Sequence, residues 1–353
     1  MQLRSEINGA ENENTEAEVD YRNKVVELAK ALISDGKADR VLGWSCGEFF
    51  YDVTPAVFES AQKIDECFVY DGFCGANLSK YLVNETKKTD GANTKKVAVF
   101  LKPCDTYSFN QLLTEHRFER DRVYCVGISC GGMLDINKIK NSVDFPVGKI
   151  EADGSENITV CGLFGDRKTV KRTDVLLSRC LYCKGAANVE FDETAGDCKG
   201  IAITGADRFD EVRQLENMTA EQRYAFWQRE LSRCIRCNAC RDVCPACTCE
   251  KCVFGNTKSG IENKAASDPF EEKLFHIIRA FHVAGRCTDC GECSRVCPSH
   301  IPLHLLNRKF IGDIDRLFGE YQAGAEVGTR SPVTAYSPDD AEPYEAVNGG
   351  DRK

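Results

Sequence analysis

The sequence predicts an α/β domain with a mainly parallel sheet, followed by a C-terminal all-α domain. Three observations support this prediction. Residues 97–129 read as strand, helix and strand, which is typical of a parallel βαβ unit. After Gly205 the apolar residues recur at helical spacing. The same second part of the chain carries two four-cysteine runs of identical spacing, each preceded by a helical segment.

The N-terminal segment changes character near residue 18. Residues 1–17 are rich in Glu and Asn and have few apolar side chains, so we expect a flexible arm that cannot bury enough surface to fold. From Glu18 onward apolar residues recur every three or four positions, and Gly36 stands where a helix usually ends. This pattern predicts an amphipathic helix.

The sheet is predicted from short apolar runs. Residues 40–44, 97–101 and 122–129 have the composition of strands, and residues 105–116 between the last two have that of a helix. Asp105 is suited to cap this helix at its N-terminus. Further strands are expected at 158–164, 174–179, 188–192 and 199–204.

The second part of the chain is predicted to be helical. Thr219 and Gln222 form a capping-box pattern that opens a helix, and residues 268–285 predict another helix ending at a glycine. From Gln322 the sequence has no periodicity, so we expect a tail, which would alternatively wrap a partner subunit. The expected domains are therefore 18–205 (α/β), 206–321 (helical) and 322–353 (tail).

Composition and charge narrow the class of protein. The 353 residues are 42% hydrophobic, which is enough for two packed cores. A net charge of -9 argues against nucleic acid or an anionic membrane as the main partner. No apolar window reaches the length of a membrane span, and the polar N-terminus does not resemble a signal peptide. We therefore expect a cytoplasmic protein without a membrane span.

The 21 cysteines are about three times the usual number for this length. Lasting disulfides are rare in the cytoplasm, and an odd number of cysteines cannot pair completely. Metal or redox chemistry is therefore the first interpretation of these cysteines, and disulfides are the second.

Eight of the cysteines form two runs with the spacing Cys-x-x-Cys-x-x-Cys-x-x-x-Cys-Pro. This spacing holds cubane 4Fe-4S clusters, in which the fourth cysteine of each run binds the other cluster. Zinc is the alternative, but eight thiolates in two such runs exceed what tetrahedral zinc uses. The runs predict a dicluster ferredoxin-like domain with two ligand sets: Cys234, Cys237, Cys240 and Cys297 for one cluster, and Cys244, Cys287, Cys290 and Cys293 for the other.

A second group of cysteines follows predicted strands. Cys104 and Cys130 each come at the end of a strand, and the carboxyl ends of parallel strands meet at one edge of a sheet, where open α/β folds bind ligands. Cys180 and Cys183 could supply the other two thiolates of a third cluster. The alternative is that this Cys-x-x-Cys pair is redox-active or merely buried.

These motifs carry a resemblance to a known family. The segments LKPCD, GISCGGMLD and RCLYCKGAANVEFDETAGD, together with the two cysteine runs, resemble the beta subunits of coenzyme-420-dependent hydrogenases and formate dehydrogenases over residues 20–320. Members also occur beside heterodisulfide-reductase-type subunits. The resemblance implies that Cys104, Cys130, Cys180 and Cys183 hold one 4Fe-4S cluster beside a flavin.

The resemblance also implies FAD in the α/β domain. The corresponding segment is DGFCGANLSKYL, where Gly72, Gly75 and Asn77 precede a helix and could cradle a pyrophosphate. The family often has a double Gly followed by Val-Thr, whereas here a single Gly75 is followed by Ala76 and Asn77. The alternative interpretation is an ordinary helix N-terminus.

The remaining cysteines and histidines carry weaker signals. Cys247, Cys249 and Cys252 could bind another metal or guard a cluster, but we favour a structural role. The scattered cysteines are expected to be small buried side chains, although Cys74 lies in the candidate flavin loop; these are Cys46, Cys67, Cys74, Cys125, Cys161 and Cys198. The five histidines show no metal-binding spacing, and His276 and His282 are interpreted as surface or packing residues.

Taken together, the sequence predicts an electron-transfer subunit of a multi-subunit oxidoreductase of the hydrogenase, formate dehydrogenase or heterodisulfide-reductase type. It would carry three 4Fe-4S clusters, together with the FAD that the resemblance implies if the segment around Gly75 is more than an ordinary helix N-terminus, and its partners would be the other subunits of the complex. One alternative is an autonomous flavin and iron–sulfur enzyme acting on a soluble deazaflavin or nicotinamide coenzyme. Another is a non-catalytic adaptor between redox modules.

Overall fold

The computed structural model describes residues 16–87, 96–152, 156–196, 200, 207–256, 258 and 269–335. The chain divides into two compact units. The first unit comprises Met1–Cys104 and Arg120–Thr204, and the second comprises Asp105–Glu119 and Gly205–Lys353. Most of the expected N-terminal arm lies outside the described residues, as does the strand expected at 199–204 apart from residue 200.

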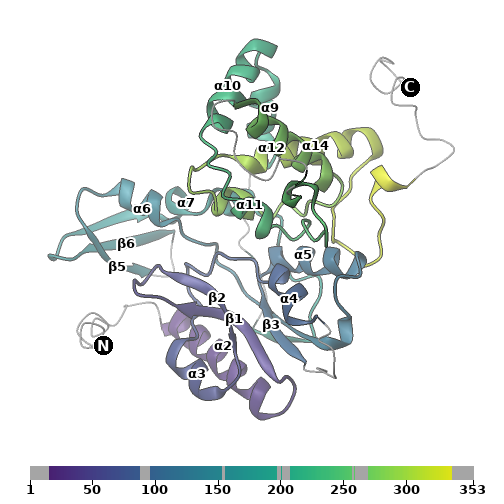
Figure 1. Ribbon diagram of the computed structural model, residues 1–353. Helices are drawn as coiled ribbons and strands as arrows, with labels where there is room; N and C mark the ends of the chain where they lie inside the picture. Colours follow the sequence, from purple (N-terminus) through teal and green to yellow (C-terminus); the bar gives the residue numbers. More distant parts are fainter. Residues whose placement is uncertain are drawn as a thin grey trace. The chain divides into compact units, whose positions relative to one another are not determined.

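A five-stranded sheet forms the centre of the first unit (Figure 1). Its strands are β1 (Arg40–Cys46), β2 (Val53–Phe58), β3 (Val97–Leu101), β4 (Val123–Ile128) and β8 (Glu193–Ala195). The strand order is β2-β1-β3-β4-β8, and every pair is parallel except β1 with β2. The predicted mainly parallel α/β sheet is therefore confirmed.

The buried central strands explain why this sheet could be predicted. All five residues of β3 are buried, as expected for a parallel strand that is covered on both faces. Helices α2 (Glu16–Ser34) and α3 (Ala61–Cys67) pack against each other, and α2 also packs on β1. The other helices of this unit are α4 (Ser79–Glu85), α6 (Ile136–Ser142), α7 (Arg172–Val175) and α8 (Ser178–Leu181).

A second, antiparallel sheet was predicted only in part. It consists of β5 (Val147–Ala152), β6 (Asn157–Gly162) and β7 (Arg167–Lys171), of which only β6 was expected. The prediction of a strand at 174–179 is wrong. This segment forms the end of α7 and the start of α8, which are joined by a short extended link. The strand expected at 188–192 is also wrong, because these residues form bends that lead into β8.

The described elements of the second unit are helices. They are α5 (Pro103–Thr114, of which residues 105–114 belong here), α9 (Asp210–Glu216), α10 (Ala220–Ser232), α11 (Ala239–Asp242), α12 (Pro269–Val283), α13 (Glu292–Arg295) and α14 (Leu303–Phe318), with short 3-10 turns η2 (Val253–Gly255) and η4 (Pro332–Thr334). Both halves of the predicted capping box form between Thr219 and Gln222. Asp105 does not cap α5, because this helix already begins at Pro103 and Asp105 lies buried in its first turn.

Part of the expected tail is packed. Ala323 and Ser331 are buried, and a Cβ atom added to Gly324 would lie 1.8 Å from the carbonyl oxygen of Tyr107. Only glycine allows this close approach of two backbone segments. The segment up to residue 335 is therefore part of the second unit, and residues 336–353 lie outside the described residues.

Helix α12 has an unusual distribution of side chains. Its buried face carries the ionisable residues Glu272, His276 and Arg279, each no more than 3% exposed. Such groups are rarely buried without a partner, so this face indicates a polar or charged site inside the unit. No helix in the described part of the chain is both long enough and apolar enough to span a membrane.

Candidate metal centres

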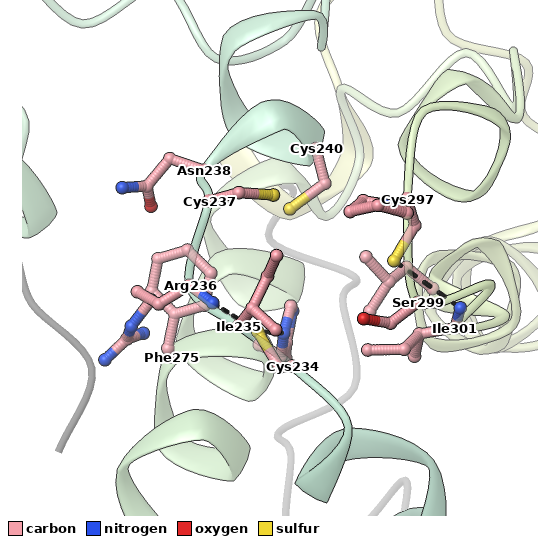
Figure 2. Close-up of a pocket in the computed structure, with 13 residues that line it drawn as sticks. Cys234, Ile235, Arg236, Cys237, Asn238, Cys240, Phe275, Cys297, Ser299 and Ile301 are labelled. Atoms are coloured by element: carbon pink, nitrogen blue, oxygen red, sulfur yellow. Dashed lines mark hydrogen bonds between the residues drawn. The ribbon is translucent and has the colours of Figure 1, made fainter. Parts of the chain in front are cut away.

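Four cysteines line one pocket of the second unit. They are Cys234, Cys237, Cys240 and Cys297, and we call them the first cysteine site. Figure 2 shows that Cys237 and Cys240 direct their sulfur atoms toward each other, while Cys297 enters from the opposite wall. Cys297 belongs to the second run, so the pocket combines residues from both runs, as the cross-ligation rule requires.

The two runs fold into the same backbone structure. Asn238 and Gly291 follow the second cysteine of their runs with φ angles of 64° and 67°, and each precedes a four-residue helix, α11 or α13. The fourth cysteine of each run then donates its backbone N–H at 3.3 Å to the carbonyl three residues earlier. The same cysteine spacing therefore gives the same chain turn in both runs, with the cysteines gathered around it.

A second group gathers around Cys244. Cys244 and Cys287 pack in one apolar cluster with Val283. Burial, together with the charges of Asp289 and Cys244, raises the pKa of Cys287 to about 12. Burial also raises the pKa values of Cys290 and Cys293, and Cys244 is among the neighbours that raise each of them. We call Cys244, Cys287, Cys290 and Cys293 the second cysteine site.

Arg279 lies beside cysteines of both sites. Its Nη2 atom donates a hydrogen bond of 2.8 Å to the carbonyl oxygen of Cys240. Although burial opposes the shift, the nearby thiols of Cys244, Cys240 and Cys293 raise the pKa of Arg279. This guanidinium is 3% exposed, so it brings a fixed positive charge to the two sites.

His276 contacts the first cysteine site directly. Its Nε2 atom lies 3.3 Å from the Sγ atom of Cys234. Burial, together with the charges of Arg279 and Arg236, lowers the pKa of His276 to about 3, so the ring is neutral at ordinary pH. With the proton on Nε2, this ring donates a hydrogen bond to sulfur, as does the backbone N–H of Arg236 at 3.3 Å.

A third group of cysteines comes together in the first unit. A hydrogen bond from the thiol of Cys104 lowers the pKa of Cys183 to about 6. Burial raises the pKa of Cys130 to about 12, and Cys180 and Cys183 are among the neighbours that raise it. We call Cys104, Cys130, Cys180 and Cys183 the third cysteine site.

The backbone explains how residues far apart in sequence reach this third cysteine site. Leu134 and Leu176 form an isolated antiparallel bridge, which holds the segment after Cys130 against the one before Cys180. A Cβ atom at Gly185 would lie 2.6 Å from the backbone nitrogen of Cys104, so only glycine lets the chain pass here.

A buried lysine accompanies the third cysteine site. Lys102 is fully buried, and its Nζ atom donates a 2.9 Å hydrogen bond to the carbonyl oxygen of Ala76. Its charge counteracts the rise in pKa that burial causes at Cys130 and Cys180. A buried ammonium is costly unless negative charge lies nearby, and ionised cysteines that hold a cluster would provide it.

Each of the three donor sets thus combines four cysteines with a buried cation, Arg279 for the first two and Lys102 for the third, and all three fit 4Fe-4S clusters chemically. Among the residues that the structure describes, no three His, Cys, Asp or Glu side chains are close enough to share a single metal ion. A cubane does not require this convergence, because each thiolate binds a different iron.

The candidate flavin loop does not show an open anion cradle. Asn77 is fully buried, and its Oδ1 atom accepts the backbone N–H of Ser79. The backbone N–H groups that would face a pyrophosphate are already used inside the loop: that of Gly75 donates to the carbonyl oxygen of Phe73 at 2.6 Å, and that of Phe73 donates to Oδ1 of Asp71 at 2.7 Å. The following helix α4 has only seven residues. These residues as described do not fit a pyrophosphate, so we assign no step to FAD here.

The other cysteines are distributed over different environments. Cys247 packs beside Cys244, Cys252 packs against the core that contains Cys234, and Cys249 is exposed. Of the scattered cysteines, Cys74, Cys125 and Cys161 are buried as expected, Cys67 is half-buried, and Cys198 lies outside the described residues. Cys46 is exposed, so the expectation of a buried side chain is wrong there.

Sequence reasoning missed the ionisable residues around the cysteines. His276 was interpreted as a surface or packing residue, and Lys102 and Arg236 were not singled out. Helical spacing places His276 on one face with Glu272 and Arg279, and such a face opposite an apolar stripe is normally the solvent-exposed one. The sequence pattern therefore gave no signal that this face is buried.

Comparison with known proteins supports the assignment of the second unit. Residues 230–301, which include both cysteine runs, match the family model described as a 4Fe-4S dicluster domain. This match favours iron–sulfur clusters over zinc for the two runs.

Two curated relatives match most of the chain rather than its second unit alone. The F420-dependent formate dehydrogenase subunit beta of Methanocaldococcus jannaschii is 26% identical over 339 residues, covering 79% of this chain and 86% of that protein. The F420-dependent formate dehydrogenase 1 subunit beta of Methanococcus maripaludis is 26% identical over 323 residues, covering 74% of this chain and 80% of its own length. The resemblance predicted from the sequence is therefore confirmed.

A solved structure of the F420-reducing NiFe hydrogenase complex from Methanosarcina barkeri, studied by xenon derivatization, also matches. It is 18% identical, covers 45% of this chain and 58% of that chain, and has a TM-score of 0.35. At this TM-score we draw no conclusion from the structural likeness.

Proposed function

We propose that this chain, a relative of the beta subunits of F420-dependent formate dehydrogenases, is an iron–sulfur electron-transfer subunit of a multi-subunit oxidoreductase. The single observation that carries the proposal is the pocket in which cysteines of both runs meet. Two cubanes that share ligands from two interleaved runs lie close enough to exchange electrons. The protein supplies their spacing, their surroundings and a surface for docking.

Three clusters are part of this proposal. The first and second cysteine sites would hold one 4Fe-4S cluster each in an all-α dicluster domain, and the third cysteine site would hold another in the α/β unit. The hydrogen-bonded pair of Cys104 and Cys183 and the burial of Lys102 support the third cluster. A flavin is retained only as a prediction from the family, because Gly72, Gly75 and Asn77 offer it no open cradle.

The proposed direction follows from the distribution of sites. One site lies in an α/β unit of the kind that binds ligands, and two lie in a small helical unit. Electrons would pass between the third cysteine site and a partner subunit through the dicluster sites. The partners would be the other subunits of a hydrogenase, formate dehydrogenase or heterodisulfide-reductase-type complex.

The function is tested by electron delivery to whatever subunits co-purify under anaerobic conditions. Cys290→Ser should slow reduction of the partner while the third cysteine site remains reducible, because it interrupts the second cysteine site alone. Cys249→Ser is the matched control, since Cys249 is an exposed cysteine outside the three sites. Equal loss of partner reduction in both variants, or none in either, would exclude the dicluster sites as the route.

A further inference from the structure

Arg236 and Asp289 occupy equivalent positions in the two cysteine runs. Each follows the first cysteine of its run by two residues and precedes the second by one. Each also adopts the left-handed backbone conformation, with φ angles of 55° and 54°. The repeated fold therefore presents a cation beside one cysteine site and an anion beside the other.

Arg236 is a buried cation without a hydrogen-bonding partner. Its side chain is 6% exposed, and its guanidinium group lies 4.1 Å from the centre of the Phe275 ring. Within the part of the chain that the structure describes, none of its three guanidinium nitrogens has a hydrogen-bond partner. Since a buried charge is costly without an opposite charge, the anionic cluster of the first cysteine site is the natural counterion.

Other groups near the first cysteine site modify this charge but do not cancel it. Burial raises the pKa of Cys234, Arg236 lowers it and Glu272 raises it. Arg279, whose Nη2 atom donates a hydrogen bond of 2.8 Å to the carbonyl oxygen of Cys240, adds a second cation, which this site shares with the second cysteine site. The first cysteine site thus has the buried charges of Arg236 and Glu272 of its own and shares that of Arg279.

Asp289 is in the opposite situation. Its carboxylate lies 2.8 Å from Nε of Arg308, and the two side chains are 3% and 1% exposed. Arg208 lies at 4.0 Å on the other side, and pairs with Asp315 at 3.5 Å. The second cysteine site therefore adjoins compensated ion pairs rather than an unpaired cation, since Glu292 beside Cys290 is itself paired with Arg295 at 2.7 Å. Both sites share the Arg279 cation, so Arg236 is the charge that distinguishes the first site from the second.

We propose that Arg236 gives the first cysteine site the higher reduction potential of the two dicluster sites. An electron that enters the second unit is then held mainly at the first cysteine site. Reduction adds one negative charge, which a nearby buried cation stabilises and a nearby anion destabilises. The hydrogen bond from His276 to Cys234 acts in the same direction. Arg236 thus acts through its charge on the cluster and determines which of the two dicluster sites is reduced first. This inference rests on the proposed function.

The first cysteine site is also the more solvent-exposed of the two dicluster sites. Cys237 is exposed and its neighbour Ile235 is 57% exposed, whereas Cys244 and Cys293 of the second cysteine site are buried. An electron held at the first cysteine site is therefore held where a partner's cofactor can approach it. The site that we propose to be reduced first is therefore also the site that is more exposed to a partner.

The proposal is tested by potentiometric titration of the anaerobic, cluster-loaded full chain, followed by electron paramagnetic resonance. The wild type should show two dicluster signals of different potential. Arg236→Gln should lower the higher potential enough to change the ratio of reduced to oxidised cluster at least tenfold, which is about 59 mV for one electron, and leave the lower potential unchanged. Arg236→Lys, which keeps the charge, is the matched control and should change the higher potential less.

Glu272→Gln is a second, independent variant. It removes the anion near Cys234 and should raise the same signal that Arg236→Gln lowers. If Arg236→Gln loses its cluster, the test rests on Glu272→Gln. Equal wild-type potentials, no shift in either variant, or a shift of the lower signal would each overturn the proposal. A chain that binds no iron would instead contradict the proposed function.

Discussion

The Nε2 atom of His276 lies 3.3 Å from the Sγ atom of Cys234, and the ring is 1% exposed. The contact joins helix α12 to the start of the first cysteine run. It explains why α12 buries polar residues, because a thiolate that holds a cluster needs donors in a site that water does not reach. Hydrogen bonds to cluster sulfur are one of the few means by which a protein sets reduction potential.

His276→Phe should lower the potential of the first cysteine site without changing the iron content. Phenylalanine keeps a buried ring next to Phe275 but removes the N–H donor to sulfur. The measurement is the same anaerobic titration, with total iron determined on the same sample. His282→Phe is the matched control, because His282 is an exposed residue of the same helix that contacts the ring of Phe254. Identical potentials in the two variants would contradict the role given to the N–H donor.

Cys183→Ala should remove about four irons per chain, the content of one cubane, and leave the dicluster signals intact. The reason is that Cys183 is hydrogen-bonded to Cys104 in the third cysteine site. Cys161→Ala provides the control, because Cys161 is a buried cysteine of β6. Should the Cys183 variant retain all of its iron, the Cys-x-x-Cys pair is structural.

Asp289→Asn should destabilise the second unit by about 3–5 kcal/mol, because it leaves the buried guanidinium of Arg308 without its carboxylate. The loss is measured as a lower midpoint of unfolding in guanidinium chloride, followed by circular dichroism on the cluster-loaded chain. Asp207→Asn should leave the midpoint unchanged, since Asp207 and Arg213 form a half-exposed pair. Similar midpoints for the two variants would show that the buried pair does not stabilise the unit.

Removal of the clusters should unfold the second unit. A core cluster of this unit contains Cys234, Cys240 and Cys293, so the proposed iron–sulfur bonds would hold together residues of the core. Oxidation in the presence of a chelator should abolish much of the helical circular dichroism signal. The full chain is used because residues 105–119 belong to this unit. A colourless chain with undiminished helix content would contradict this dependence.

The sequence predicted the elements whose signals are local. The buried strand at 97–101, the helix at 268–285 and the two cysteine runs each have a pattern that can be read within about twenty residues. Strand β2 was missed because Pro55 interrupts it, and proline is tolerated there only because the strand lies at the edge of the sheet. The segment 174–179 was misread because a short apolar run does not distinguish a strand from a helical turn.

The chemical surroundings of the sites could not be predicted in the same way. Arg236 and Asp289 look like ordinary surface charges in the sequence, since the groups that cover their side chains, Phe275 and Arg308, come from distant helices. Arg308, which pairs with Asp289, is on α14. Whether a charge is paired depends on tertiary packing, so the difference between the two runs appears only in the folded chain.

The most direct test of the account is a combined iron, acid-labile sulfide and zinc analysis of the full chain purified without oxygen, with Mössbauer spectroscopy to identify the cluster type. The account predicts about twelve irons and twelve sulfides per chain, which correspond to three cubanes. About eight irons and eight sulfides per chain would exclude only the cluster proposed for the third cysteine site. A folded chain that contains zinc and no acid-labile sulfide would contradict the central claim.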